Sequence, residues 1–278
     1  MVLEALVNPF GAEQHPWSAL GLGVLYTSLA ILLSLWIFPQ HGSLVIIFLT
    51  VMACTPLLYN VIRREERKSI DSIAELSLLK EHGRVLSFLL YFFAGMTLCF
   101  AGWYIFLPEQ TTQVLFQVQS QTIYNINNEI TGNAQLDVAA RSLFFVKVLL
   151  NNIKVMFFCI LFSFLYGVGA IFILAWNASI IATAMGNFIR SQLSTSSNYF
   201  AITSLGIARY AIHGIPEVAA YFIAGIAGGI ISVAMINHEL GSEKNKRILL
   251  DSVNLILIAT VLLVVAAALE VFVVAVLF

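Results

Sequence analysis

The chain has 278 residues, of which 60% are hydrophobic and only 10% are charged, and its formal net charge is -1. Soluble globular domains carry about a quarter of their residues as charged ones, so this composition excludes a soluble protein and indicates a polytopic membrane protein. The 14 lysines and arginines form no basic face, which excludes nucleic acid as a partner.

Residues 1–62 predict an N-terminal interfacial helix followed by a membrane hairpin. The first part ends at His15-Pro16-Trp17, where proline stops a helix and tryptophan favours the headgroup level. The runs 20–38 and 44–62 are uncharged and long enough to cross about 30 Å of hydrocarbon at about 1.5 Å per residue. No cleavable signal pattern begins the chain, so the first run is expected to remain a membrane helix.

Residues 63–84 predict a cytoplasmic amphipathic loop. This segment holds six of the 14 basic residues, and such short basic loops face the cytoplasm. A stripe of Ile70, Ile73, Leu76 and Leu79 within it has helical spacing. With a hairpin before this loop, the N-terminus is expected in the cytoplasm as well.

The remainder, 85–278, is expected to form one membrane domain with an outer-face segment at 108–142. Residues 85–107 cross outward, and the following segment is rich in Gln, Asn and Thr with Arg141 as its only base, which fits the outer face. Its apolar residues have approximately helical spacing, so we expect either a small ordered loop or a helix that faces a partner.

Two later segments are too short to cross the bilayer. Residues 155–176 return inward, but 178–189 would span about 18 Å as a helix and 199–212 about 21 Å. The second short segment stops at His213-Gly214, where we expect the chain to break within the membrane or near its outer face.

The final two runs complete the predicted architecture. Residues 216–237 return to the cytoplasm, where Lys244, Lys246 and Arg247 follow, and 248–278 crosses outward, so the C-terminus is expected outside. The predicted fold is therefore an all-α polytopic membrane helix bundle with about five full spans and two short or re-entrant half-helices.

Ionisable residues at four-residue steps mark the strongest candidate site: Arg209, His213 and Glu217. One interpretation is a structural cluster that satisfies itself and fixes helix packing at the break. The other is an ion, proton or substrate site, because unwound backbone at membrane depth is tolerated where it is buried or lines a cavity. No nucleophile and no second histidine at zinc spacing accompany the cluster, so we expect no catalytic residue, metal or cofactor.

Other candidate residues lie around the first short segment and in small-residue runs. Asn177 and Arg190 bracket that segment, and Asn177 is either a simple N-cap or the start of an anion site at a helix N-terminus. Small residues predict close helix packing, either within the chain or between two copies. These residues are Gly167, Gly169, Gly225, Gly228 and Gly229.

Taken in order, three motifs resemble the stage II sporulation protein M family of integral membrane proteins. The motifs are Asn151-Asn152-Ile153-Lys154, Trp176-Asn177-Ala178 and His213-Gly214-Ile215-Pro216-Glu217. The resemblance covers roughly 85–278. The family usually has proline before the histidine, whereas Ile212 stands here, which softens the expected helix break. The hairpin of residues 1–62 looks like that of archaeal members, which do not form spores.

The resemblance implies a non-enzymatic membrane scaffold or membrane-remodelling component, because bacilli relatives act with peptidoglycan-degrading partners during engulfment. The alternative is a small transporter or channel that uses the predicted break around His213 and Glu217. The expected partners are the lipid bilayer, a second copy through the small-residue seams, and a membrane or outer-face protein. The expected location is the cell membrane.

Overall fold

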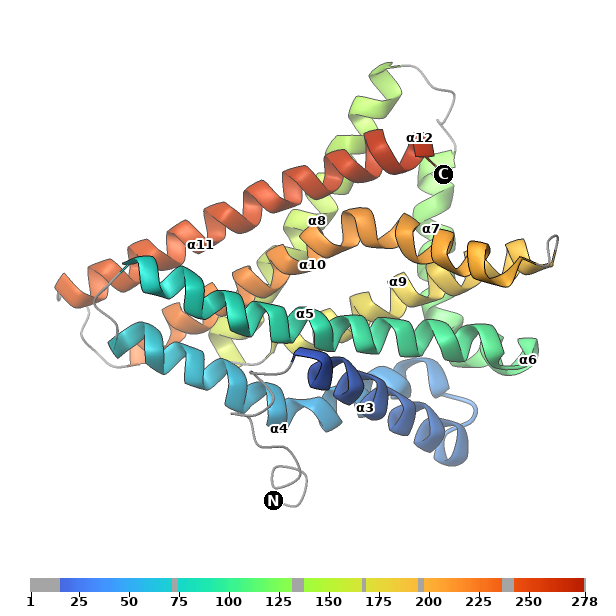
Figure 1. The fold of residues 1–278 in the computed structure, drawn as a ribbon, viewed down its shortest axis with the longest axis horizontal. Coiled ribbons are helices and arrows are strands. Elements are labelled where there is room, and N and C mark those ends of the chain that lie inside the picture. The colour runs from blue at the N-terminus through green and yellow to red at the C-terminus, as the bar shows by residue number, and fades with distance from the viewer. Residues whose placement is uncertain are drawn as a thin grey trace.

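The protein is described here from a computed structural model that covers residues 16–71, 75–131, 138–166, 169–194, 198–236 and 243–277. These residues form helices and no strands (Figure 1). The helices are α3 (Pro16–Ile37), α4 (Gly42–Asp71), α5 (Glu75–Phe106), α6 (Glu109–Leu115), α7 (Gln117–Thr131), α8 (Val138–Tyr166), α9 (Ala170–Leu193), α10 (Tyr199–Ile236), α11 (Glu243–Ala268), the π-helix η1 (Leu269–Val274) and α12 (Ala275–Leu277). The expected all-α membrane bundle is confirmed.

Among the described residues, seven helices are long and apolar enough to cross a membrane. They are α3, α4, α5, α8, α9, α10 and the helix that runs through α11, η1 and α12. The expected count of five spans and two half-helices is therefore corrected, because the two short segments belong to full-length helices. The interfacial helix expected before Pro16 lies outside the described residues, and the described parts of 63–84 continue α4 and α5.

The first short segment was misplaced because α8 ends earlier than predicted. It ends at Tyr166, and α9 begins at Ala170, so the turn that carries Gly169 separates two helices that the sequence analysis joined. Asn177 does not start a half-helix. Its side-chain Nδ2 donates a hydrogen bond of 2.8 Å to the Ile173 carbonyl one turn earlier in α9, which is compatible with an uninterrupted helix.

The predicted chain break at His213 to Pro216 is also wrong. α10 is helical from Tyr199 to Ile236 and contains Pro216. Proline removes one backbone hydrogen bond and crowds the carbonyl four residues earlier, but membrane helices tolerate it where neighbouring helices support them. Figure 1 shows α10 bending in its middle part, which is the usual response to an internal proline.

The ends of the membrane-spanning helices lie at two opposite ends of the bundle. The α3–α4 turn, α6, α7, the end of α9 and the start of α10 lie at one end, and the other end holds the last turn of α4, the start of α5, the last turn of α8, the start of α9, the last turn of α10 and the start of α11 (Figure 1). The described residues 191–194 and 198 are therefore on the same side as α6, whereas the predicted re-entrant unit placed the polar segment 191–198 on the opposite side.

Close backbone contacts bring two pairs of helices together. A Cβ added at Gly23 would overlap the Phe92 carbonyl, and one added at Gly95 would overlap the Leu20 carbonyl, so α3 and α5 touch through glycine on both sides. A Cβ added at Gly228 would lie 2.5 Å from the Ile160 carbonyl oxygen of α8. These contacts leave no room for side chains, which is how small residues drive helix association in membranes.

In the described part of segment 108–142, which was expected at the outer face, α7 packs onto the bundle. Gln119 of α7 is fully buried, and its amide joins α4 and α9. Ser43 Oγ donates to Gln119 Oε1 at 2.7 Å, and Gln119 Nε2 donates to the Ser43 carbonyl at 3.1 Å and to Ser179 Oγ at 3.4 Å. Because these polar groups satisfy one another inside the protein, α7 has a fixed position against the start of α4 and the middle of α9.

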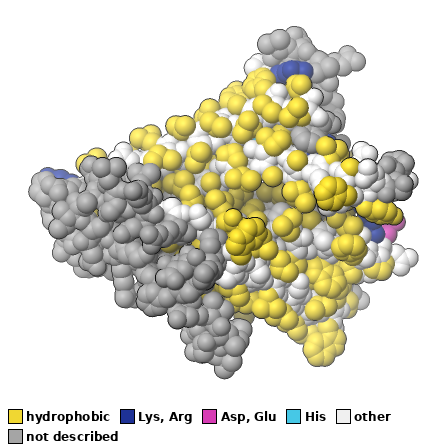
Figure 2. Space-filling model, viewed as in Figure 1, with side chains coloured by type: hydrophobic (Ala, Val, Ile, Leu, Met, Phe, Trp, Pro, Cys, Tyr) yellow, Lys and Arg dark blue, Asp and Glu magenta, His cyan; other side chains and the backbone are white. Residues whose placement is uncertain are grey.

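Hydrophobic side chains spread over the middle of the bundle surface, and the charged side chains in the same view lie towards its margins (Figure 2). Large apolar residues such as Phe48, Phe157 and Leu257 are more than half exposed. A soluble protein would not expose so continuous an apolar surface, so lipid is the surrounding solvent.

Candidate functional site

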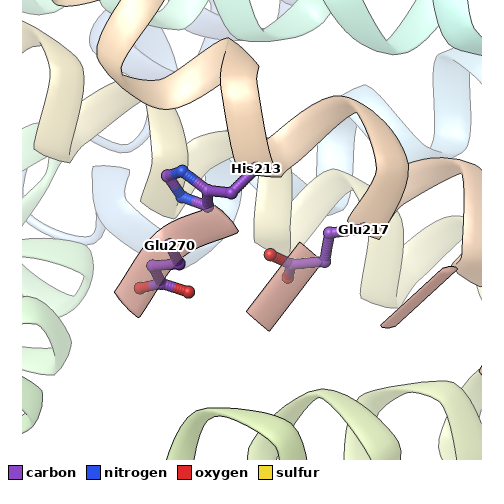
Figure 3. A group of neighbouring side chains, drawn as sticks. All are labelled: His213, Glu217 and Glu270. Atoms are coloured by element: carbon purple, nitrogen blue, oxygen red, sulfur yellow. The ribbon is translucent and has the colours of Figure 1, made fainter. Parts of the chain in front are cut away.

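Three ionisable side chains from two helices meet inside the apolar part of the bundle. His213 and Glu217 of α10 and Glu270 of η1 each offer one ligand atom, and these atoms all lie within 4.8 Å of one another (Figure 3). All three residues are partly buried. They form what we call the His–Glu–Glu cluster.

The continuous path of α10 explains why two members of this cluster lie together. Residues four apart share a face of an α-helix, so His213 and Glu217 project to the same side because the helix is not broken between them. The proline that was expected to interrupt the site therefore lies within the helix that builds it.

The third member is positioned by a π-helical turn. Glu270 lies in η1, which packs against α10 and α8. A π-turn inserts an extra residue into the helical repeat and rotates the side chains that follow it, and such turns occur frequently at functional sites. Glu270 is the second residue of this turn, and its carboxylate lies beside His213 and Glu217 of α10.

A buried tyrosine holds one carboxylate of the cluster. Tyr221 is fully buried one turn after Glu217, and its hydroxyl donates a hydrogen bond of 2.8 Å to Glu217 Oε1. This bond fixes the rotation of the carboxylate and engages one of its oxygens, so Glu217 is oriented by its own helix.

The cluster has unsatisfied polar capacity. His213 Nδ1 is buried and has no hydrogen-bond partner. Two carboxylates in close proximity also repel each other if both are ionised, and the low dielectric of the bundle strengthens that repulsion. The arrangement therefore favours a positive species, a proton or a cation, between the two glutamates and the imidazole.

Arg209 does not neutralise the cluster. Its guanidinium lies 4.9 Å from the centroid of the Phe188 ring and 6.0 Å from that of Tyr210, which are cation–π distances. No ion pair within 4 Å links Arg209 to Glu217 or Glu270, all of which the structure describes. The four-residue spacing thus brings His213 and Glu217 together but directs Arg209 to α9.

Arg190 has a structural environment at the end of α5. Its Nη2 donates to the Leu107 carbonyl at 2.8 Å, and its Nη1 donates to the Tyr104 carbonyl and to Thr112 Oγ1, both at 3.4 Å. Carbonyls at a helix C-terminus lack intrahelical donors, and a nearby cation complements the helix dipole. Asn177 is neither an N-cap nor the start of an anion site at a helix N-terminus, because α9 begins seven residues before it.

The predicted small-residue seam lies against α8. A Cβ at Gly225 would lie 3.4 Å from Ser163 Oγ, and Gly228 touches the Ile160 backbone as described above. Gly229 is buried beside them. Gly169 approaches the Phe162 carbonyl across the α8–α9 turn, and Gly167 lies outside the described residues. The seam residues whose contacts are described therefore pack within the chain.

Sequence reasoning missed Glu270 and Tyr221 as members of the site. Glu270 carried a signal, since it is an isolated acid in a long apolar run, but nothing in the sequence links it to α10. Tyr221 continues the four-residue series from Glu217, which would have placed it on the same helix face.

The fold and the cluster define a polytopic α-helical membrane protein with an ionisable site inside its membrane-spanning helices. The family model for stage II sporulation protein M matches residues 85–274. The chain belongs to this family, and the match includes every residue of the cluster. Comparisons with curated proteins and with solved structures gave no significant match.

Proposed function

We propose that the protein is a small non-enzymatic membrane transporter or channel that moves a cation or a proton through the His–Glu–Glu cluster. The observation that carries this proposal is the convergence of His213, Glu217 and Glu270 within 4.8 Å in the membrane-spanning part of the bundle. Transport ranks above the scaffold role because a purely structural role does not require a histidine and two glutamates to converge among membrane-spanning helices.

The energetic argument concerns the two glutamates. A charged side chain at the centre of a membrane helix costs about 2.5–3.5 kcal/mol on insertion scales, and such residues mark ion pathways and proton relays. Two carboxylates without an arginine or lysine partner double this cost unless a positive species neutralises them. The cluster is therefore suited to hold a cation or proton transiently.

The side of the bilayer to which each end belongs follows from charge. Lys244, Lys246 and Arg247 lie at the start of α11, and the described parts of the basic segment 63–84 lie at the same end of the bundle (Figure 1). The positive-inside rule favours the cytoplasm for this end. We therefore expect α3 to begin in the cytoplasm and α12 to end outside.

The test measures flux in liposomes that contain the purified full-length protein. One batch encloses a pH indicator and another a divalent-cation indicator, and each is challenged with a gradient. We expect flux in at least one batch, and Glu217→Gln is expected to lower it at least tenfold because it removes the charge but preserves the side-chain shape.

The matched control is Glu109→Gln, the same substitution at an exposed acid of α6. It is expected to leave flux unchanged. Absence of flux in the unmodified protein under both gradients would contradict transport, and so would equal flux in Glu217→Gln. Thermal unfolding of each variant in detergent separates loss of flux from loss of folding.

The second candidate function is a membrane scaffold, and it is favoured by family membership and by the fixed position of α7. The hydrogen bonds of Gln119 anchor α6 and α7 on the side that we assign to the exterior, where a membrane or outer-face protein or a second copy would meet them. If Glu217→Gln only lowers thermal stability and no flux occurs, the scaffold role becomes the better description.

A further inference from the structure

We infer that the His–Glu–Glu cluster binds a divalent first-row transition metal ion such as Zn²⁺ or Mn²⁺, with His213, Glu217 and Glu270 as its ligands. This inference rests on the proposed function in one respect, since it names the cation class that the proposed route carries. The site itself is argued from its donors, its charge and its geometry.

The donor set selects the class of metal. One imidazole nitrogen and two carboxylate oxygens are borderline ligands that suit Zn²⁺, Mn²⁺ and Fe²⁺. Ca²⁺ takes six to eight oxygen ligands and Mg²⁺ keeps several waters, so a three-residue site with a nitrogen donor disfavours both. Sequence spacing gave no metal site because Glu270, the third donor, comes from another helix.

The charge of the two glutamates favours a divalent metal ion over a monovalent one. Two ionised glutamates carry a charge of -2, and a divalent ion with a neutral imidazole makes the site neutral, whereas a monovalent cation leaves an uncompensated negative charge. An uncompensated charge is costly in the low dielectric of the bundle. Within the described residues Arg209 forms no ion pair with either glutamate, and its guanidinium lies 4.9 Å from the centroid of the Phe188 ring.

The distances fit a site that closes around its ion. The three ligand atoms lie within 4.8 Å of one another. Three ligands at about 2.0–2.2 Å from a tetrahedral metal lie about 3.3–3.6 Å from one another, so the side chains must move together by up to about 1.5 Å to complete the site. Because the ligands come from α10 and η1, metal binding would tie the last helix to α10.

Two further observations support a metal site: His213 has an unpartnered ring nitrogen, and Glu217 is held in place by a hydrogen bond. His213 Nδ1 is buried without a hydrogen-bond partner. Tyr221 holds Glu217 through Oε1 and leaves the other carboxylate oxygen for a metal. Hydrogen bonds of this kind orient metal ligands, and their loss typically weakens metal affinity 10–100-fold.

The experiment titrates the purified full-length protein in detergent with Zn²⁺ and Mn²⁺, and with Mg²⁺ and Ca²⁺ for comparison, by calorimetry and by competition with a chromogenic chelator. We expect one ion per chain, and we expect Glu270→Gln and His213→Ala to weaken binding at least tenfold. Tyr221→Phe is expected to weaken it about 10–100-fold. Glu109→Gln serves as the control that retains binding.

A folding readout keeps the test decisive if a variant is unstable. Ligands that bind the folded state raise the melting temperature, so the metal should stabilise the unmodified protein and fail to stabilise Glu270→Gln. The inference is overturned if neither ion binds, if Glu270→Gln and His213→Ala both bind normally, or if Mg²⁺ or Ca²⁺ binds equally well.

The two proposals can fail separately. Proton flux that depends on Glu217 in a protein that binds neither Zn²⁺ nor Mn²⁺ overturns the metal site and leaves transport in place. One bound metal per chain that depends on Glu270 and His213, with no flux under either gradient, supports the metal site and overturns transport.

Discussion

Gly95→Ala is expected to lower the melting temperature of the protein by roughly 5 °C or more in detergent. The added methyl group would overlap the Leu20 carbonyl, and a backbone atom cannot rotate out of the way as a side chain can. Overpacking of this kind costs about 1–3 kcal/mol, and about 2–4 °C accompanies each kcal/mol in a chain of this size. A thermal unfolding curve monitored by circular dichroism or by differential scanning fluorimetry gives the result.

The control is Gly102→Ala in the same helix. A Cβ at Gly102 meets nothing within 4 Å, so this change is expected to leave the melting temperature unchanged or to raise it slightly, since alanine favours helix over glycine by about 1 kcal/mol. Equal melting temperatures for both variants would show that α3 and α5 are not in backbone contact.

Gly228→Ala is expected to impair both stability and function. The new Cβ would lie 2.5 Å from the Ile160 carbonyl oxygen, so α10 must move away from α8. α10 carries His213 and Glu217, and α8 also packs against η1, so this displacement should widen the His–Glu–Glu cluster. We expect a loss of about 1–3 kcal/mol and a cation flux at least several-fold lower than that of the unmodified protein.

Gly214→Ala provides a sharp comparison because Gly214 lies between two members of the cluster. A Cβ there meets nothing within 4 Å, so flux and stability should both be retained. If Gly214→Ala lowers flux and stability more than Gly228→Ala does, the role assigned to the α8–α10 contact is wrong. Closeness to the cluster in the sequence would then matter more than helix packing.

The sequence predicts the class of fold well and the limits of some helices poorly. Long uncharged runs identify α3, α4 and the membrane part of α5, because hydrocarbon thickness sets a length that composition reveals directly. The limits of α8 and α9 are harder to predict from the sequence. Asn177 looks like a helix start, but it lies inside α9, where its side-chain amide donates a hydrogen bond to the Ile173 carbonyl. Pro216 misleads in the same way, because a supported helix bends instead of ending.

The sequence predicted two of the three residues of the candidate site. The spacing of His213 and Glu217 predicts a shared helix face, and that face exists. Glu270 could not be joined to them, because no local pattern encodes which helices pack together. The same limit applies to Gly23 and Gly95, which nothing in their sequence surroundings distinguishes from Gly21 and Gly102, where a methyl group meets nothing.

The most direct test of a single cation site is a double-mutant cycle on flux through proteoliposomes. Glu217→Gln, Glu270→Gln and the double variant are compared with the unmodified protein under the gradient that gives flux. Two carboxylates that hold one ion act as a unit, so the double variant should be no slower than the slower single variant. Multiplied losses in the double variant, or full flux in either single variant, would contradict a shared site formed by α10 and η1.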